Sequence, residues 1–511
     1  MTSTQTELKE NRIVEYDSGQ EKENREHIEH LSSHPILPLI VRLSFASVIS
    51  FIATTIYEIL DSVFIGSFTN ETILGGVSAF LFFEWLVSLQ MGVSVGVASG
   101  AVISHALGEG NEMRAKKTLL YFIVFGCFWT VLVPVIAIPL LPQILPLVGV
   151  EDIVYEETYD YAVIVIAGSG LCYFIVGFSI IFRAENLALT SMIIQIVPPI
   201  LNLGGDPLFM KAFDMGAFGA GLSTVVSNFA GLLVGIWIYI RADSKVTVRL
   251  SKDVLKAPTD KEALAKIAGM ALPNYLFGCN NAIGGILASN NIAKYTQNET
   301  ETMMWIAAYG SSCRLSNMIF LPSQGIAGSI PTILGFNIGS KNWKRCWETI
   351  WKAFLTLLVF SWVLCLIILS FARPIASLFA TTTEMEDILT YMARITTIPL
   401  FFCCIVMTMF SIYQSERSGK FQLYIACVGW VGMILCVYAI PAAFDDVKGF
   451  KYVMFGFHFV MLISTFVLLP CKIAHYISKS KEEVIECEDS EEMGSGRAEE
   501  RANDAEIIAN N

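Results

Sequence analysis

Four acidic side chains lie where the sequence otherwise predicts helices buried in lipid. Glu58, Asp61, Glu84 and Asp206 each stand inside a long apolar segment. An ionised carboxylate near the middle of a bilayer costs at least ~2.5–3.5 kcal/mol on insertion scales, so its presence there indicates a function. A desolvated carboxylate can carry a proton, and hard cations prefer oxygen ligands. These acids therefore predict binding of H⁺ or Na⁺ within the membrane.

The spacing of the acids places them in pairs. Glu58 and Asp61 are three residues apart and Asn202 and Asp206 are four apart, so each pair shares one face of a helix. The segment PPILNLGGDPLF around Asp206 is rich in proline and glycine, which predicts an irregular helix. Irregular backbone persists in a membrane only against protein or water, and its carbonyls can then bind a cation. We expect Asp61, Asn202 and Asp206 to form one site.

The composition predicts an all-α polytopic membrane protein. Of the 511 residues 54% are hydrophobic and 16% are charged, against roughly 25% charged in an average soluble domain. Segments such as 119–141 and 353–371 carry no charge, and about 20 apolar residues suffice for a helix to cross a bilayer. Twelve spans are predicted, near 37–64, 73–104, 118–141, 161–182, 189–209, 217–240, 264–292, 303–335, 350–371, 387–412, 420–441 and 452–475.

The charged residues predict the orientation and the domain organisation. Most loop Lys and Arg residues follow even-numbered spans, which places these loops and both termini in the cytosol. The net charge of -12 comes mainly from the polar ends, which we expect to be disordered. The predicted parts are an N-tail over 1–35, an N-terminal lobe over 36–240, a cytosolic linker over 241–262, a C-terminal lobe over 263–476 and a C-tail over 477–511.

Two glycosylation sequons bear on the location of the protein. They begin at Asn70 and Asn298, and both fall in predicted external loops. This position suits a eukaryotic secretory route. We therefore expect a multi-pass protein of a eukaryotic membrane, with the plasma membrane favoured over the vacuolar membrane.

The two halves of the chain are similar at an offset of 231 residues. Phe182 and Glu185 fall on Tyr413 and Glu416. At the same offset, the loop residues Gly108, Asn111 and Arg114 fall on Gly339, Asn342 and Arg345. Six spans per copy predict two parallel-repeat lobes, the arrangement of some secondary transporters, with the substrate between the lobes. Asn202 and Asp206 fall on Met433 and Val437, so cation coupling is expected in the N-terminal lobe alone.

Several motifs in order resemble the multidrug and toxin extrusion (MATE) family. They are YEILDSVFIG, GVSVGVASGAVISHALGEGN, FRAENLALTSM, LNLGGDPLF, GAFGAGLSTVVS and the span-eight segment AAYGSSCRLSNMIFLPSQGIAGSIPTILGFNIGSKN. The resemblance covers about residues 40–475 and implies an antiporter that exports organic, often cationic or amphipathic compounds in exchange for H⁺ or Na⁺ by alternating access.

The resemblance also implies the residues of the cation site. By position these are Asp61, Asn202, Asp206 and Thr224. Two departures stand out: Ala46 replaces the span-one proline, and Glu58 replaces the usual asparagine. We hypothesise that Glu58 and Asp61 share a proton, as close carboxylates do. No resident cofactor is expected, and no metal beyond Na⁺ at this site.

The substrate site is predicted between the lobes, where aromatic and methionine surfaces adapt to varied ligands. Its candidate residues are Phe82, Phe83, Glu84, Gln90, Met91, Asn280, Asn281 and Tyr309. We expect a monomer that contacts small organic substrates and the bilayer but no nucleic acid. A lipid-linked oligosaccharide flippase of the same wider superfamily is the alternative. An enzyme is disfavoured because no embedded nucleophile–base set, DHHC or HExxH pattern is present.

Overall fold

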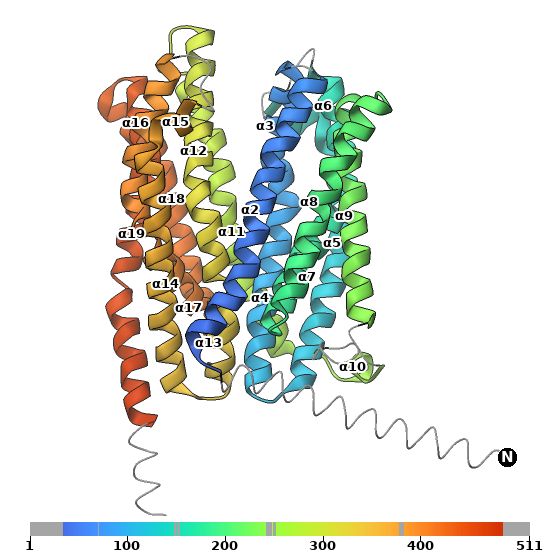
Figure 1. Cartoon of the computed structure of the whole chain (residues 1–511), viewed down its shortest axis with the longest axis vertical. Coiled ribbons are helices and arrows are strands. Elements are labelled where there is room, and N and C mark those ends of the chain that lie inside the picture. The colour runs from blue at the N-terminus through green and yellow to red at the C-terminus, as the bar shows by residue number, and fades with distance from the viewer. Residues whose placement is uncertain are drawn as a thin grey trace, which may run out of the picture.

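The structure of the chain is a computed structural model that describes residues 34–69, 71–147, 150, 154–241, 248, 252–377 and 383–483. Within these ranges the chain is helical apart from short turns and contains no strand. Two helical bundles stand side by side (Figure 1). Asn70, most of both predicted tails and much of the predicted linker lie outside the described residues.

The first bundle contains the six predicted spans of the N-terminal lobe. Two of these spans are divided into two helices, and one ends in a π-helical turn. The elements are α2 (Ile36–Phe68), α3 (Glu71–Val87), α4 (Leu89–Gly108), α5 (Glu112–Leu147), α6 (Tyr155–Ala167), α7 (Ser169–Ala184), α8 (Ala188–Asp206), η2 (Pro207–Ala212) and α9 (Gly216–Arg241). The short α10 (Lys252–Lys256) lies in the linker.

The second bundle repeats this plan. Its elements are α11 (Lys261–Ile292), α12 (Glu299–Ala327), α13 (Ile330–Gly339), α14 (Trp343–Ser370), α15 (Ala372–Ser377), α16 (Thr383–Leu400), α17 (Cys403–Ser415), α18 (Gly419–Phe444), η3 (Val447–Tyr452) and α19 (Val453–Phe466). A last helix covers 469–483. The predicted fold class, with twelve spans in two lobes, is confirmed.

The described part contains nine helices apolar enough to cross a membrane, or eleven if two bent pairs count as single spans. The remaining predicted span, α11, is less apolar because it carries several asparagines. Of these, Asn274, Asn280 and Asn291 are buried among neighbouring helices. Asn291, for example, donates from Nδ2 to the carbonyl of Val437 on α18 at 2.9 Å. Packing inside the bundle therefore shields the polar face of α11 from lipid.

The backbone itself shows the internal repeat. The pairs α6–α7 and α16–α17 both bend by 48°. Left-handed φ angles also recur at the offset of 231, at Gly110 and Lys341, Asn186 and Arg417, and Asp214 and Asp445. A left-handed residue other than glycine is uncommon, so three matched pairs indicate that the two copies have the same turns.

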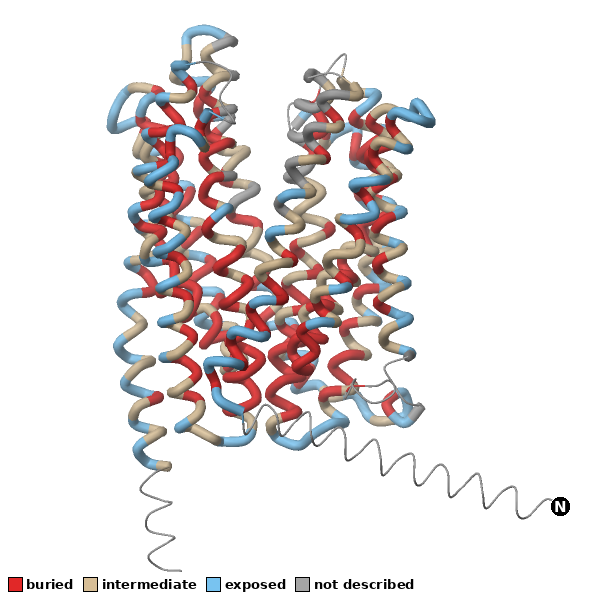
Figure 2. The backbone as a smooth tube through the Cα atoms, in the orientation of Figure 1, coloured by how far each residue is buried: buried red, intermediate tan, exposed pale blue. Residues whose placement is uncertain are grey.

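The lobes meet at the end that carries the start of α2 and the short α10, the predicted cytosolic end, and diverge toward the other end (Figure 1). Figure 2 shows buried residues concentrated where the two bundles approach each other. At this crossing Gly108 of α4 lies against Gly339 of α13, and a Cβ on Gly339 would come within 3.1 Å of the Gly108 Cα. On the diverging part of α2, Ile52 and Ile56 are about half exposed.

Two expectations are corrected. The helix around Asp206 is not irregular where predicted: α8 continues through Pro198 and Pro199 to Asp206, and only then does a π-helical turn begin at Pro207. Pro207 lacks the N–H that would continue the α-helical ladder, which accounts for the change of register. Residues 477–483, assigned to the disordered tail, continue the last helix, where Glu483 accepts from the Lys344 amide at 2.7 Å.

Candidate functional site

The four residues that the resemblance assigns to a cation site come from three helices of the N-terminal lobe. Asp61 lies on α2, Asn202 and Asp206 on α8, and Thr224 on α9. Asp61, Asn202 and Asp206 are 8%, 2% and 1% exposed. The amide of Asn202 donates to Ser223 Oγ at 3.0 Å and to Thr224 Oγ1 at 3.2 Å. These contacts join α8 to α9 and orient the amide oxygen of Asn202.

The acceptor atoms of this cluster outnumber its donors. Asp61, Asn202 and Ser223 are the polar neighbours of Asp206. Neither carboxylate oxygen of Asp206 accepts a hydrogen bond of ordinary geometry from a described residue, and neither does Asn202 Oδ1. A buried acceptor without a donor costs about 1–3 kcal/mol, and more if it is charged. Three such oxygens close to a second carboxylate therefore favour occupation by a cation or a proton.

Two tyrosines that sequence reasoning missed adjoin the cluster. Tyr57 of α2 lies beside Thr224 and Asp61, and Tyr161 of α6 lies within electrostatic range of Glu84 and Asp61. Tyr57 carried a signal, because it precedes Asp61 by four residues and so shares its helix face. Nothing in the sequence marked Tyr161, since it stands in a different helix, where an apolar stretch begins. The side chain of Glu58 lies outside the described residues.

The predicted substrate residues whose side chains the structure describes do not gather in one place. Glu84 lies near the two tyrosines of the cation cluster. Gln90 is buried between the lobes, where its amide donates to the Asn274 carbonyl of α11 at 3.0 Å. Phe83 and Met91 are partly buried against the apolar cores. The side chains of Phe82 and Asn281 lie outside the described residues.

Two further predicted substrate residues lie inside the C-terminal lobe. Tyr309 is 2% exposed and its hydroxyl lies 3.5 Å from the sulfur of Met454 on α19. Asn280 is also 2% exposed and faces α18, where a Cβ on Gly429 would lie 2.9 Å from its Nδ2. In this conformation both side chains pack within one lobe.

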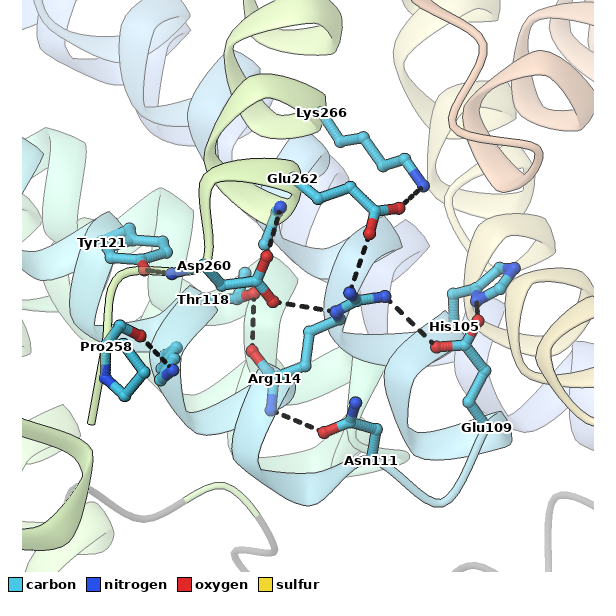
Figure 3. A network of polar contacts seen from close by, with 12 residues as sticks. His105, Glu109, Asn111, Arg114, Thr118, Tyr121, Pro258, Asp260, Glu262 and Lys266 are labelled. Atoms are coloured by element: carbon cyan, nitrogen blue, oxygen red, sulfur yellow. Dashed lines mark hydrogen bonds and ion pairs between the residues drawn. The ribbon is translucent and has the colours of Figure 1, made fainter.

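A second polar cluster lies at the predicted cytosolic end, where the lobes meet (Figure 3). Arg114 at the start of α5 contacts Asp260 at 2.9 Å, Glu262 at 3.0 Å and Glu109 at 3.6 Å. Asp260 and Glu262 stand at the start of α11, so this arginine connects the two lobes. On the opposite side, Arg417 of the C-terminal lobe lies 3.1 Å from the ring of His105 at the end of α4.

Asp260 also caps α11. Its carboxylate accepts from the Ala263 amide at 3.0 Å, and its own amide donates to the Tyr121 hydroxyl at 2.7 Å. Burial alone would raise the pKa of Asp260, but the Ala263 amide and the Arg114 guanidinium outweigh burial and hold the pKa below its ordinary value of 3.8. Asp260 therefore stays ionised at neutral pH and remains a partner for Arg114.

Two parallel six-helix lobes that close at one end, with a buried acidic cluster in one lobe, define a fold of the secondary-transporter class. The MatE family model matches residues 46–208 and 304–438, more than half of the chain. The chain therefore belongs to the multidrug and toxin extrusion (MATE) family of membrane transporters.

Curated relatives and solved structures agree with this family. The chain is 24% identical to the multidrug export protein MepA of Staphylococcus aureus over 82% of this chain and 90% of that protein. It is similar to an outward-facing multidrug resistance MATE transporter, with a TM-score of 0.77 and 19% identity over 88% of this chain and 98% of that one. A MOP superfamily transporter from Pyrococcus furiosus matches with a TM-score of 0.77 and 20% identity, over 88% of this chain and 98% of that chain.

Proposed function

We propose that this protein exports organic, often cationic or amphipathic compounds in exchange for H⁺ or Na⁺. Family membership supports transport, and the name of the staphylococcal relatives supports multidrug export. The observation that supports cation coupling is the group of three buried oxygens of Asp206 and Asn202 that accept no hydrogen bond of ordinary geometry from a described residue, beside the second carboxylate of Asp61. The eukaryotic host and the glycosylation of Asn298 remain predictions, and the staphylococcal relatives are bacterial.

In this proposal the cation cluster takes up H⁺ or Na⁺ from the outer side. Asp61 and Asp206 supply the charge, while Asn202 supplies an amide oxygen held in place by Ser223 and Thr224. Two nearby carboxylates in a desolvated site repel each other, so a bound proton or Na⁺ stabilises the cluster. Occupation thus changes the electrostatic balance between α2, α8 and α9.

The driving force is sufficient for useful export. One elementary charge that moves across 100 mV releases ~2.3 kcal/mol, which corresponds to roughly a 50-fold gradient of a neutral compound exchanged one for one. A single cation site in one lobe can therefore drive the cycle, and the C-terminal lobe needs no second acid.

Proteoliposomes loaded with a fluorescent organic cation test this proposal. Efflux is measured under an imposed pH gradient, an imposed Na⁺ gradient or neither, for the wild type and for Asp61→Asn and Asp206→Asn. Asp160→Asn is a matched control because it neutralises an exposed acid of the same lobe. We expect at least a ten-fold loss of gradient-driven efflux in the two cluster variants and none in the control.

The outcomes separate the alternatives. Stimulation by only one of the gradients identifies the coupling ion. Undiminished gradient-driven efflux in both Asp61→Asn and Asp206→Asn would overturn the assignment of the site. Absence of efflux from wild-type vesicles under either gradient, for cationic and neutral probes alike, would overturn the proposed export activity.

A further inference from the structure

The repeated motif Gly-x-x-Asn-x-x-Arg occurs once in each lobe, and the proposed cation chemistry does not use it. Its copies are Gly108, Asn111 and Arg114, and Gly339, Asn342 and Arg345. Both copies lie at the cytosolic end, in the turns that join α4 to α5 and α13 to α14. We infer that the two copies form the cytosolic gate of the transporter, with each arginine clasping the first helix of the opposite lobe.

The glycine of each motif allows the closest approach of the lobes. A Cβ on Gly108 would lie 2.9 Å from the Phe336 carbonyl carbon and closer still to its oxygen, while one on Gly339 would meet the His105 carbonyl and the Glu109 amide. These neighbours are backbone atoms, which cannot swing aside. The ends of α4 and α13 therefore touch through bare backbone, and any larger side chain would force them apart.

The asparagine of each motif fixes the turn. Asn111 Oδ1 accepts from the Arg114 amide at 3.0 Å, and Asn342 Oδ1 accepts from the Arg345 amide at 3.1 Å. Each asparagine thus caps the following helix. The residues before the caps, Gly110 and Lys341, both have left-handed φ angles, of 72° and 60°. Both arginines consequently leave their helices from equivalent first-turn positions.

The arginine of each motif reaches across to the other lobe. Arg114 contacts Asp260 and Glu262 at the start of α11, the first helix of the C-terminal lobe. Arg345 donates from Nη2 to the His34 carbonyl at 2.8 Å, two residues before α2, the first helix of the N-terminal lobe. The two contacts are related by the same pseudo-twofold axis, although Arg114 binds carboxylates and Arg345 binds a backbone carbonyl.

Other contacts between the lobes occur in the same half of the molecule. Ser104 donates to the Thr332 carbonyl at 2.6 Å and Ser44 contacts Ser329 at 3.3 Å. Lys117 also donates to the carbonyl of Pro258, in the linker just before α11. Alternating access, on which this inference rests, requires the lobes to part at this end. The contacts of Arg114 and Arg345 with the opposite lobe must then break, so both arginines are positioning residues that favour the cytosol-closed state.

Hydrogen–deuterium exchange of the full-length protein in lipid nanodiscs tests the gate without substrate or ion gradients. The reporters are peptides covering 100–108 and 330–339, which are buried between the lobes. For Arg114→Ala and Arg345→Ala we expect exchange in both reporters to rise on the order of ten-fold, because Arg114→Ala removes two charge-assisted contacts with the other lobe and Arg345→Ala removes one. Peptides from the outer part of α16 should exchange as in the wild type.

Matched controls remove similar charges without touching the other lobe. Lys116 pairs with Glu112, and Lys352 with Glu348, each within one helix, so Lys116→Ala and Lys352→Ala should leave both reporters unchanged. The charge reversal Arg114→Glu should open the gate further, and adding Glu262→Arg should restore protection at least three-fold. This rescue separates contact between the lobes from a local folding defect.

Each result bears on the inference. Unchanged exchange in Arg114→Ala and Arg345→Ala would overturn it. A uniform rise across all helices, including α16, would assign the arginines to overall stability and would also overturn it. Hydrogen exchange is measured without transport, so a negative efflux assay would not affect the conclusion about the gate. Unchanged hydrogen exchange in the arginine variants would likewise not affect the assignment of the cation site.

Discussion

Replacement of Gly108 by alanine tests how tightly the lobes must close. The added Cβ would lie 2.9 Å from the carbonyl carbon of Phe336, whereas ordinary van der Waals contact begins at 3.4 Å. The ends of α4 and α13 must therefore separate by at least about half an ångström. Overpacking of this kind costs about 1–3 kcal/mol, which corresponds to a roughly 5- to 150-fold shift between the cytosol-closed and cytosol-open states.

Gly269→Ala provides the matched control. Gly269 lies within α11 in the same half of the molecule, and a Cβ there would meet nothing within 4 Å. Alanine is favoured over glycine in a helix by about 0.5–1 kcal/mol, so this variant should be neutral or slightly stabilised. The comparison removes helix propensity from the interpretation.

Fluorescent efflux and hydrogen exchange should be measured on the same preparations. Gly108→Ala should raise exchange in 330–339 by at least five-fold and lower the efflux rate, because the closed state is populated less. A double replacement with Gly339→Ala should be worse than either single one. Wild-type exchange in Gly108→Ala, with efflux retained, would refute the claim that bare-backbone contact controls closure.

Three further predictions concern single residues. Tyr476→Phe removes the 2.9 Å hydrogen bond to Glu416 from a residue that is 1% exposed. The free energy of unfolding should fall by about 1–3 kcal/mol, and the melting temperature should fall with it. Tyr424→Phe, at an exposed position, is the control and should leave the melting temperature unchanged. The pKa of Asp260 is lower in the folded protein than its ordinary value of 3.8, so the ionised carboxylate stabilises the fold at pH values above 3.8. This stabilisation is lost as the pH falls through the lower pKa of the folded state. The difference in melting temperature between the wild type and Asp260→Asn should therefore disappear in acid. Expression in a glycosylating host should give a glycosidase-sensitive mass shift that Asn298→Gln abolishes, because Asn298 is exposed at the start of α12.

Much of the fold could be predicted because a bilayer leaves few choices. Long uncharged segments must be helices, so the span count followed from lengths alone. The repeat in loop residues such as Gly108 and Gly339 predicted two equivalent lobes. The sequence did not reveal that α8 passes through Pro198 and Pro199 intact. Proline usually kinks or breaks a helix, and whether a membrane helix tolerates it depends on packing that no local pattern records.

The candidate cation site was more predictable than the candidate substrate site for a physical reason. A buried acid such as Asp206 is expensive wherever it occurs, so its presence alone indicates a function. Apolar or amide side chains such as Tyr309 and Asn280 are stable in many surroundings, and here they pack inside one lobe. Tyr161 joined the site only because α6 packs against it, which no local pattern records.

The path of α2 has a consequence for how the two ends of the molecule influence each other. This helix carries Asp61 in its C-terminal half, and in its N-terminal half the Val48 amide nitrogen faces Gly325 of α12, where a Cβ on Gly325 would lie 3.1 Å from it. The two positions are about 20 Å apart along one unbroken helix. If α2 moves as a rod, cation affinity and lobe closure are thermodynamically linked. Reciprocity then requires two equal effects. Opening of the gate changes the affinity for the cation by the same factor by which cation binding changes the equilibrium between the open and the closed gate.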